Sequence, residues 1–107
     1  MNLDSLAERL SLDVEDIREL LELYVETTTS DLAELKGAIE AKNAPLAHTK
    51  AHSIKGGSGN LGLDKMFELS KEIDDRVRVN SLDGVDNMFQ VLQKQFNNIV
   101  NDFEKSF

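Results

Sequence analysis

The segment from residue 43 to residue 62 reads NAPLAHTKAHSIKGGSGNLG, and it holds both histidines and four of the six glycines of the chain. Asparagine and proline at its start favour a helix N-terminus, because asparagine can accept a free amide and proline lacks the N–H that would stay unpaired. Gly62 is typical of the left-handed residue that follows a last helical turn. We therefore expect one helix over this segment, ending at Gly62.

Apolar side chains recur every three or four residues on both sides of this segment, which is the spacing of one helical face. The stripe before it runs from a predicted cap at Asp13 toward Lys42, with a short leading helix ahead of it. After it, a helix is expected to begin with Asp64 as its cap. A turn over residues 80–84 then precedes a last helix that begins at Val85.

No segment alternates between apolar and polar residues with period two, so nothing favours a strand. Amphipathic helices of this length, joined by short turns, form antiparallel bundles. We predict an all-α fold, an antiparallel four-helix bundle with a short extra N-terminal helix. A length of 107 residues fits one domain, covering residues 1–107.

Composition excludes several classes of function. The chain has no cysteine, which rules out disulfides, thiol catalysis and cysteine metal sites. Its net charge of −8 makes it a poor partner for nucleic acid, whose phosphates dominate affinity. No apolar run approaches the roughly 20 residues that span a bilayer, and the acidic N-terminus is unlike a signal peptide. We expect a cytoplasmic monomer that binds neither nucleic acid nor membrane.

One face of the glycine-rich helix is polar. With about 100° per residue, His48, His52, Lys55, Gly56 and Gly59 lie opposite its apolar side. Lys55 lies one turn after His52, within reach of whatever that imidazole carries. Packing gives no reason for glycine at 56 and 59 on an exposed face. These glycines either open space for another macromolecule or belong to a helix end that tolerates glycine.

The run from residue 51 to residue 62 resembles the signature of histidine-containing phosphotransfer (HPt) domains. That pattern has an alanine, the phosphorylated histidine, two further residues, Lys-Gly, and a Leu-Gly pair that closes the helix. Here the fixed positions are filled by Ala51, His52, Lys55, Gly56, Leu61 and Gly62. The resemblance extends over nearly the whole chain, including its size and helical order.

The resemblance implies a phosphocarrier. His52 would accept a phosphoryl group from an aspartyl phosphate of a receiver domain and pass it to another receiver aspartate, or back. Neutral Nε2 would attack, Lys55 would balance the charge of the transferring group, and Gly56 would give the receiver access. The implied partners are response-regulator receiver domains and a hybrid sensor histidine kinase. The alternative is an adaptor bundle that docks receiver or kinase domains without transfer.

We expect no enzyme in its own right, since the chain has no P-loop and no kinase nucleotide-binding motif. It also has no cage of carboxylates at ligand spacing, so no metal or cofactor of its own is expected. The Mg²⁺ that phosphoryl transfer commonly needs would be supplied by the receiver domain.

The resemblance also implies a polar side chain on the third long helix that holds the Nδ1 proton of His52, in the region of Asp74. Many relatives carry a longer Glu or Gln there. Asp74 is therefore either this positioning residue or merely a solvated helix charge. Arg76 and Arg78 are further candidates for contact with phosphate or receiver.

His48 lies four residues before His52, and three interpretations are open. It can be a second phosphorylation site, although Lys-Gly does not follow it. It can be half of a His-x-x-x-His metal pair, which needs a third ligand from another helix. It can be a solvent-exposed surface histidine, which is the expectation here.

A receiver domain needs an exposed apolar patch beside the phosphorylated histidine. Two segments near the N-terminus offer one, with apolar side chains at Leu3, Leu6, Leu10, Ile17 and Leu21. The same side chains can instead close the end of the core.

Overall fold

The computed structural model describes the backbone of residues 3–106 and the side chains of residues 5–106. Five helices account for most of this part of the chain, and no strand occurs in it. They are α1 (Leu3–Leu10), α2 (Val14–Glu40), α3 (Ala44–Asn60), α4 (Asp64–Arg78) and α5 (Val85–Ser106). The prediction of an all-α fold is confirmed.

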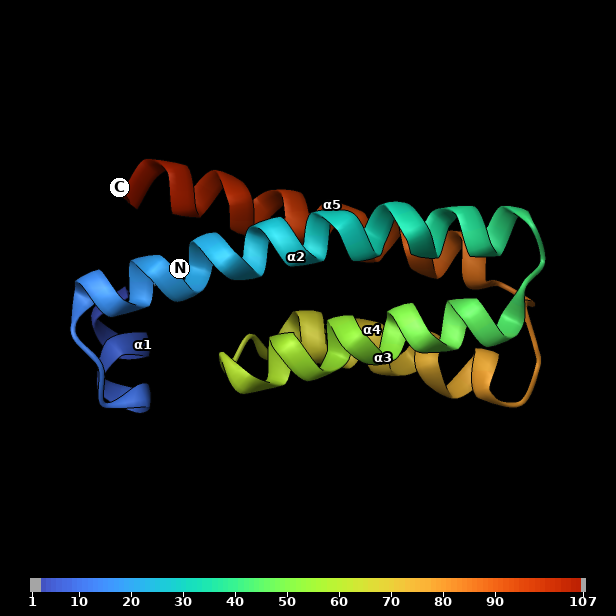
Figure 1. Ribbon diagram of the computed structural model, residues 1–107, viewed down its shortest axis with the longest axis horizontal. Helices are drawn as coiled ribbons and strands as arrows, with labels where there is room; N and C mark the ends of the chain where they lie inside the picture. The colour runs from blue at the N-terminus through green and yellow to red at the C-terminus, as the bar shows by residue number, and fades with distance from the viewer. Residues whose placement is uncertain (1–2, 107) are drawn as a thin grey trace.

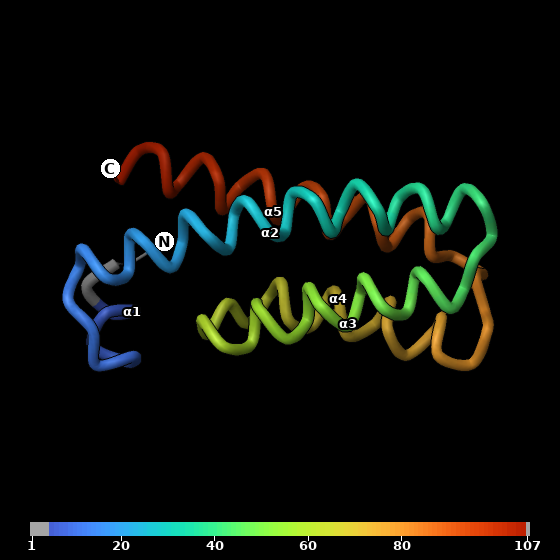
Figure 2. The backbone as a smooth tube through the Cα atoms, viewed as in Figure 1, coloured from blue at the N-terminus to red at the C-terminus, as the bar shows by residue number. Residues whose placement is uncertain are grey.

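The four long helices form a closed antiparallel bundle. Each of α2–α3, α3–α4, α4–α5 and α2–α5 is a contacting pair. Figure 1 shows α2 and α5 along one side and α3 and α4 along the other, with α1 at the end where α2 begins. The tube in Figure 2 makes the short connections at residues 41–43 and 61–63 easy to follow. This is the predicted four-helix bundle with an extra N-terminal helix.

Local capping sets three of the predicted helix ends. Oδ1 of Asp13 accepts the amide of Asp16 at 2.9 Å, and Oδ1 of Asn43 accepts the amide of Leu46 at 3.2 Å. Gly62 adopts a φ of 70°, the left-handed conformation that glycine takes without a Cβ penalty. These three predicted caps are confirmed.

The start of α4 differs from the prediction. Its N-cap is Leu63, which makes no side-chain cap hydrogen bond, and Asp64 is the first helical residue. The carboxylate of Asp64 still favours this helix start, because the positive end of the helix dipole attracts an anion in the first turn. The sequence therefore placed the boundary one residue late.

The N-terminal apolar side chains belong to the core. Ile17 and Leu21 have no exposed surface, Leu6 is buried, and Leu10 packs against the cluster. The side chain of Leu3 lies outside the described residues. Of the two alternatives, closing the end of the core is confirmed for Leu6, Ile17 and Leu21, so a docking patch at these three residues is wrong.

A contact from α1 to the connection between α3 and α4 supports this closure. The Arg9 guanidinium lies beside Gly62, with Nη1 3.5 Å from its carbonyl oxygen. Within the described residues, none of the helices is both long and apolar enough to cross a membrane.

Candidate functional site

Helix α3 presents two chemically different sides. Ala47, Ala51 and Ile54 are fully buried between α2 and α4, where the alanines let the helices approach closely. His52 lies on the other side with 61% of its side chain exposed. The predicted separation of an apolar side from a histidine-bearing side is confirmed.

Asp74 is the centre of the polar cluster on that side. It comes from α4, and its side chain has no exposed surface although it carries a carboxylate. Its Oδ2 accepts hydrogen bonds from Lys55 Nζ at 2.9 Å and from Arg78 Nη2 at 3.0 Å. The interpretation of Asp74 as a solvated helix charge is wrong, since the charge is buried and paired.

His52 turns Nδ1 toward this carboxylate. Nδ1 lies 3.4 Å from Asp74 Oδ2, longer than the usual 2.7–3.2 Å of an N–H···O hydrogen bond. An aspartate on α4 therefore reaches the imidazole, but only at the limit of hydrogen bonding. That Asp74 positions the ring during a reaction stays a prediction.

The electrostatics of Asp74 reflect two opposing effects. Burial raises the pKa of the Asp74 carboxyl. Hydrogen bonds from Lys55 and His52, together with the charge of Lys55, lower this pKa by more than burial raises it. The net result is a pKa below the ordinary value of 3.8. Asp74 is thus ionised at neutral pH and holds a negative charge beneath His52.

Lys55 and Gly56 lie where the sequence placed them. The side chain of Lys55 is only 18% exposed, because it reaches back to Asp74 rather than into solvent. Around Gly56 the space is open, and an added Cβ would meet no other atom within 4 Å. The helix therefore has a bare backbone one turn after the imidazole.

Glycine at position 59 is explained by packing. A Cβ at this position would lie 3.2 Å from Cδ2 of Phe67 on α4, which is tighter than ordinary van der Waals contact. The expectation that packing does not explain Gly59 is wrong, because the α3–α4 connection brings an aromatic ring over it. Of the two glycines, Gly56 alone borders open space.

His48 is only partly exposed, and it is not an isolated surface histidine. Its side chain is 38% exposed, and Nε2 lies 3.0 Å from Oδ1 of Asp74. The two imidazole rings are neighbours, with centroids 5.9 Å apart. Asp74 Oδ1 nevertheless has no hydrogen-bond partner of good geometry among the described residues. His48, His52 and Asp74 thus form one cluster.

The two arginines on α4 have different partners. Arg78 lies four residues after Asp74 and binds its carboxylate, a pairing that helical spacing favours. Arg76 donates to the carbonyl of Asp83 at 2.8 Å and so holds the turn before α5. The proposal of a phosphate contact therefore has geometric support for Arg78 and none for Arg76.

The cluster around Asp74 forms a polar seam between α3 and α4. A second polar seam joins α2 to α3, and the sequence did not predict it. The Tyr24 hydroxyl and Ser58 Oγ are 2.8 Å apart, and Ser53 Oγ donates to Asp31 Oδ2 at 2.7 Å. Burial raises the pKa of Tyr24. The helical spacing of Tyr24 and Asp31, seven residues apart, is the signal that both face one neighbour.

Lys50 closes the same seam by an ion pair with Glu34 of α2. This hydrogen bond lowers the pKa of the Glu34 carboxyl and raises that of the Lys50 ammonium. The pair places a lysine at the edge of the apolar side of α3.

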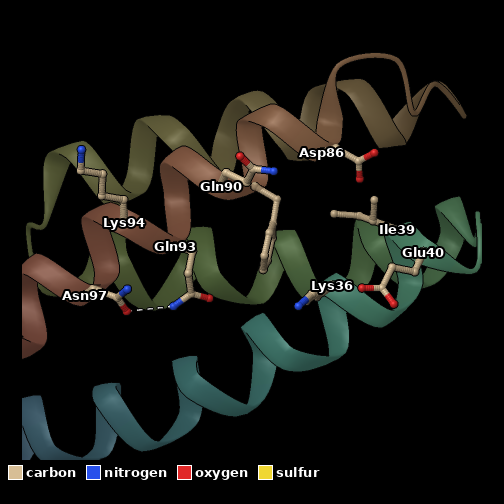
Figure 3. Close-up of a pocket in the computed structure, with 9 residues that line it drawn as sticks. Lys36, Ile39, Glu40, Asp86, Gln90, Gln93, Lys94 and Asn97 are labelled. Atoms are coloured by element: carbon tan, nitrogen blue, oxygen red, sulfur yellow. Dashed lines mark hydrogen bonds between the residues drawn. The ribbon is translucent and has the colours of Figure 1, made fainter.

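A groove of about 550 Å³ lies between α2 and α5 (Figure 3). Charged and amide side chains surround it, and its lining residues are Lys36, Ile39, Glu40, Asp86, Phe89, Gln90, Gln93, Lys94 and Asn97. None of the residues around Asp74 contributes to this lining. The groove is therefore separate from the histidine cluster.

Comparison with known proteins decides the family. The family model described as Hpt domain matches residues 19–102, which is most of the chain and includes the whole cluster. The chain belongs to the Hpt domain family. The exposed His52 on α3 is the histidine that stands at the phosphorylated position of the HPt signature in the sequence.

Two curated relatives of this Hpt domain are involved in phosphorelays by name. The chain is 28% identical over 92 residues to phosphorelay intermediate protein rdeA of Dictyostelium discoideum. It is 32% identical over 88 residues to multistep phosphorelay regulator 1 of Schizosaccharomyces pombe. The matches cover 83% and 77% of this chain but only 36% and 30% of those proteins.

A solved structure has the same architecture. Histidine-containing phosphotransfer protein B (HptB) from Pseudomonas aeruginosa aligns with a TM-score of 0.85 at 26% sequence identity. The alignment covers 97% of this Hpt domain and 88% of that chain. The all-α bundle is therefore the fold of a known phosphotransfer protein.

Proposed function

We propose that this Hpt domain is a phosphorelay intermediate that carries a phosphoryl group on Nε2 of His52. The observation that supports this best is the orientation of that imidazole. His52 is largely exposed, its Nδ1 faces the buried carboxylate of Asp74, and Nε2 is left for an incoming group. The names of the relatives support the same conclusion.

In the proposed step, the lone pair of neutral Nε2 attacks phosphorus of an aspartyl phosphate in a receiver domain. The N–P bond forms as the P–O bond to the receiver aspartate breaks, and that carboxylate leaves with the electron pair. The proton on Nδ1 stays on the ring, where the anionic Asp74 accepts it in a hydrogen bond. Transfer to a second receiver aspartate is the same step reversed.

Charge compensation falls to Lys55. Its ammonium lies one turn from His52 and is held by Asp74 Oδ2 at 2.9 Å. Negative charge spreads over the equatorial oxygens of the transferring phosphoryl group, and a nearby cation stabilises it. Asp74 keeps this ammonium beside the ring before phosphate arrives, so little reorganisation is needed.

Access for the receiver falls to Gly56, where the backbone is bare and the space is open. The receiver domain would bring the Mg²⁺ that supports the chemistry at its own aspartate. The partners of this proposal are response-regulator receiver domains and a sensor kinase that carries such a domain.

A transfer assay read by intact mass tests the proposal. The purified chain is mixed with a phosphorylated receiver domain and Mg²⁺, alongside His52→Gln and His48→Gln variants. We expect one acid-labile phosphoryl group on wild type and on His48→Gln, and none on His52→Gln.

Two results would overturn the proposal. Labelling of His52→Gln at the wild-type level would move the acceptor to another residue. A folded wild-type chain that binds receiver domains but takes no label from any of them would indicate an adaptor instead.

A further inference from the structure

Three side chains that prefer transition metals meet beside the proposed phosphoacceptor. One ligand atom from each of His48, His52 and Asp74 lies within 4.8 Å of the other two. The histidines are four residues apart on α3, so both rings project from one side of a single helix. The carboxylate comes from α4 and supplies the third ligand that a histidine pair alone lacks.

The distances fit a small ion. His48 Nε2 is 3.0 Å from Asp74 Oδ1, and His52 Nδ1 is 3.4 Å from Oδ2. Neighbouring ligands on a tetrahedral zinc ion, with bonds near 2.0–2.1 Å, are about 3.3 Å apart. Since His52 is largely exposed, its ring can turn to complete the site without disturbing the core.

The buried oxygen Oδ1 is a second observation that favours a bound cation. It is fully buried, points toward His48 and has no hydrogen-bond partner of good geometry among the described residues. An unsatisfied buried oxygen of a charged group is costly, and a bound ion would remove that cost. Lys55 and Arg78 both bind the other oxygen, Oδ2, and so leave Oδ1 available.

We propose that His48, His52 and Asp74 form a binding site for a divalent transition-metal ion of the zinc class. Two imidazoles and one carboxylate suit zinc, copper or nickel, whereas magnesium and calcium prefer oxygen ligands. With three protein ligands, water completes the coordination. Lys55 and Arg78 repel a cation, which makes the site weaker than a closed structural zinc site.

Metal at this site would silence the phosphoacceptor, a consequence that rests on the proposed function. A neutral imidazole whose Nδ1 is bound to metal carries its proton on Nε2. That nitrogen then has no lone pair with which to attack phosphorus. Metal binding and phosphorylation of His52 thus exclude one another.

A binding titration tests the site without any receiver domain. Zn²⁺ is titrated against the full chain in competition with a chromophoric chelator at neutral pH. We expect one Zn²⁺ per chain, with at least about 10-fold weaker binding for His48→Gln, since even outer partners of a metal site contribute that much. Asp75→Asn is the matched control, because Asp75 is the exposed neighbour that pairs with Lys71 instead.

A variant that is expected to bind Zn²⁺ more tightly makes the titration more discriminating. Arg78→Gln removes a cation from Asp74 and leaves all three ligands in place, so it should tighten Zn²⁺ binding. Equal affinity of wild type, His48→Gln and Asp75→Asn would overturn the site, because zinc would then be held by the acidic surface in general.

The transfer assay tests the consequence separately. Zn²⁺ should suppress labelling of wild type, a chelator specific for zinc over magnesium should restore it, and His48→Gln should be at least about 10-fold less sensitive. Labelling that continues with Zn²⁺ bound would overturn the exclusion. Absence of labelling without zinc would count against the proposed function and leave the titration result standing.

Discussion

The two polar seams of α3 differ in how their groups are satisfied. Toward α2, Tyr24 pairs with Ser58 and Ser53 pairs with Asp31, each through a short hydrogen bond. Toward α4, four side chains converge on Asp74, two of them long cations, and its buried Oδ1 still has no hydrogen bond of good geometry from any described residue. In the first seam the polar groups named here are paired by hydrogen bonds, and we call it saturated. In the second seam the buried Oδ1 of Asp74 can still accept a ligand.

This difference separates a structural contact from a site. A saturated seam fixes the register of two helices and gains nothing from a ligand. An over-supplied carboxylate beside an exposed imidazole has donors that can move to an incoming anion and an oxygen that can accept a cation. Substitutions that treat the two seams alike should therefore have unlike effects.

The largest difference is expected between the two lysines of α3. Lys55→Ala should lower the rate of phosphoryl transfer about 100-fold, because one preorganised stabilising group at a reacting centre is typically worth this much. The rate is measured with a phosphorylated receiver domain in single-turnover conditions.

Lys50→Ala is the matched control, since Lys50 pairs with Glu34 at the α2 seam. It should transfer within about 2-fold of wild type, in line with the small energies of exposed ion pairs. Similar losses in both variants would mean that the charge of α3 as a whole, rather than its position, assists transfer.

Asp74→Asn should destabilise the fold by about 1–3 kcal/mol at pH 7, because Lys55 and Arg78 lose the charge of the buried carboxylate with which they pair. Asp31→Asn should cost less than about 1 kcal/mol, because an amide oxygen can still accept from Ser53. Urea unfolding at pH 7 measures both changes.

The same comparison has a pH dependence. Because the folded pKa of Asp74 lies below 3.8, its contribution to stability is present above that pH and is lost as the pH falls through the folded pKa. The stability of Asp74→Asn should thus fall less steeply than that of wild type in this acid range. Parallel curves for the two proteins would contradict the lowered pKa.

Tyr24→Phe tests the saturated seam. It removes one buried hydroxyl and leaves Ser58 Oγ without it, so the free energy of unfolding should fall by about 1 kcal/mol. Phosphoryl transfer should stay at the wild-type rate, since Tyr24 lies on α2, bonds Ser58 of α3 and is not one of the groups around Asp74. A transfer defect without loss of stability would show that the two seams are coupled.

The smallest expected effect separates the two exposed glycines. Gly56→Ala should raise stability by up to about 1 kcal/mol, because alanine favours a helix and nothing crowds this position. Gly59→Ala should gain less, since its Cβ would crowd the ring of Phe67. Thermal unfolding compares them, and transfer should slow in Gly56→Ala if the receiver needs the bare backbone.

Features within a single helix could be predicted from the sequence. The caps at Asp13 and Asn43 and the left-handed Gly62 follow from local chemistry, and the structure has all three. The exposed position of His52 followed from helical spacing alone. Family resemblance then connected the spacing of His52, Lys55 and Gly56 to a function.

Features that depend on how helices meet could not be predicted. Periodicity does not give the register of α4 on α3, so it could not show that Asp74 is buried or that Phe67 covers Gly59. It also could not show that His48 shares a carboxylate with His52. For the same reason, Leu6 was placed on a possible docking patch although it is buried in the core.

The connection at residues 61–63 has a consequence for how the domain is assembled. His52 and Asp74 are only 22 residues apart in sequence, on two helices joined by this three-residue turn. Closing so short a loop costs little chain entropy, so the hairpin can form before α1 and α5 find their places. The proposed nucleophile, its counter-charge and the proposed positioning carboxylate thus lie on one helical hairpin, so a single local unit of the chain assembles the proposed site.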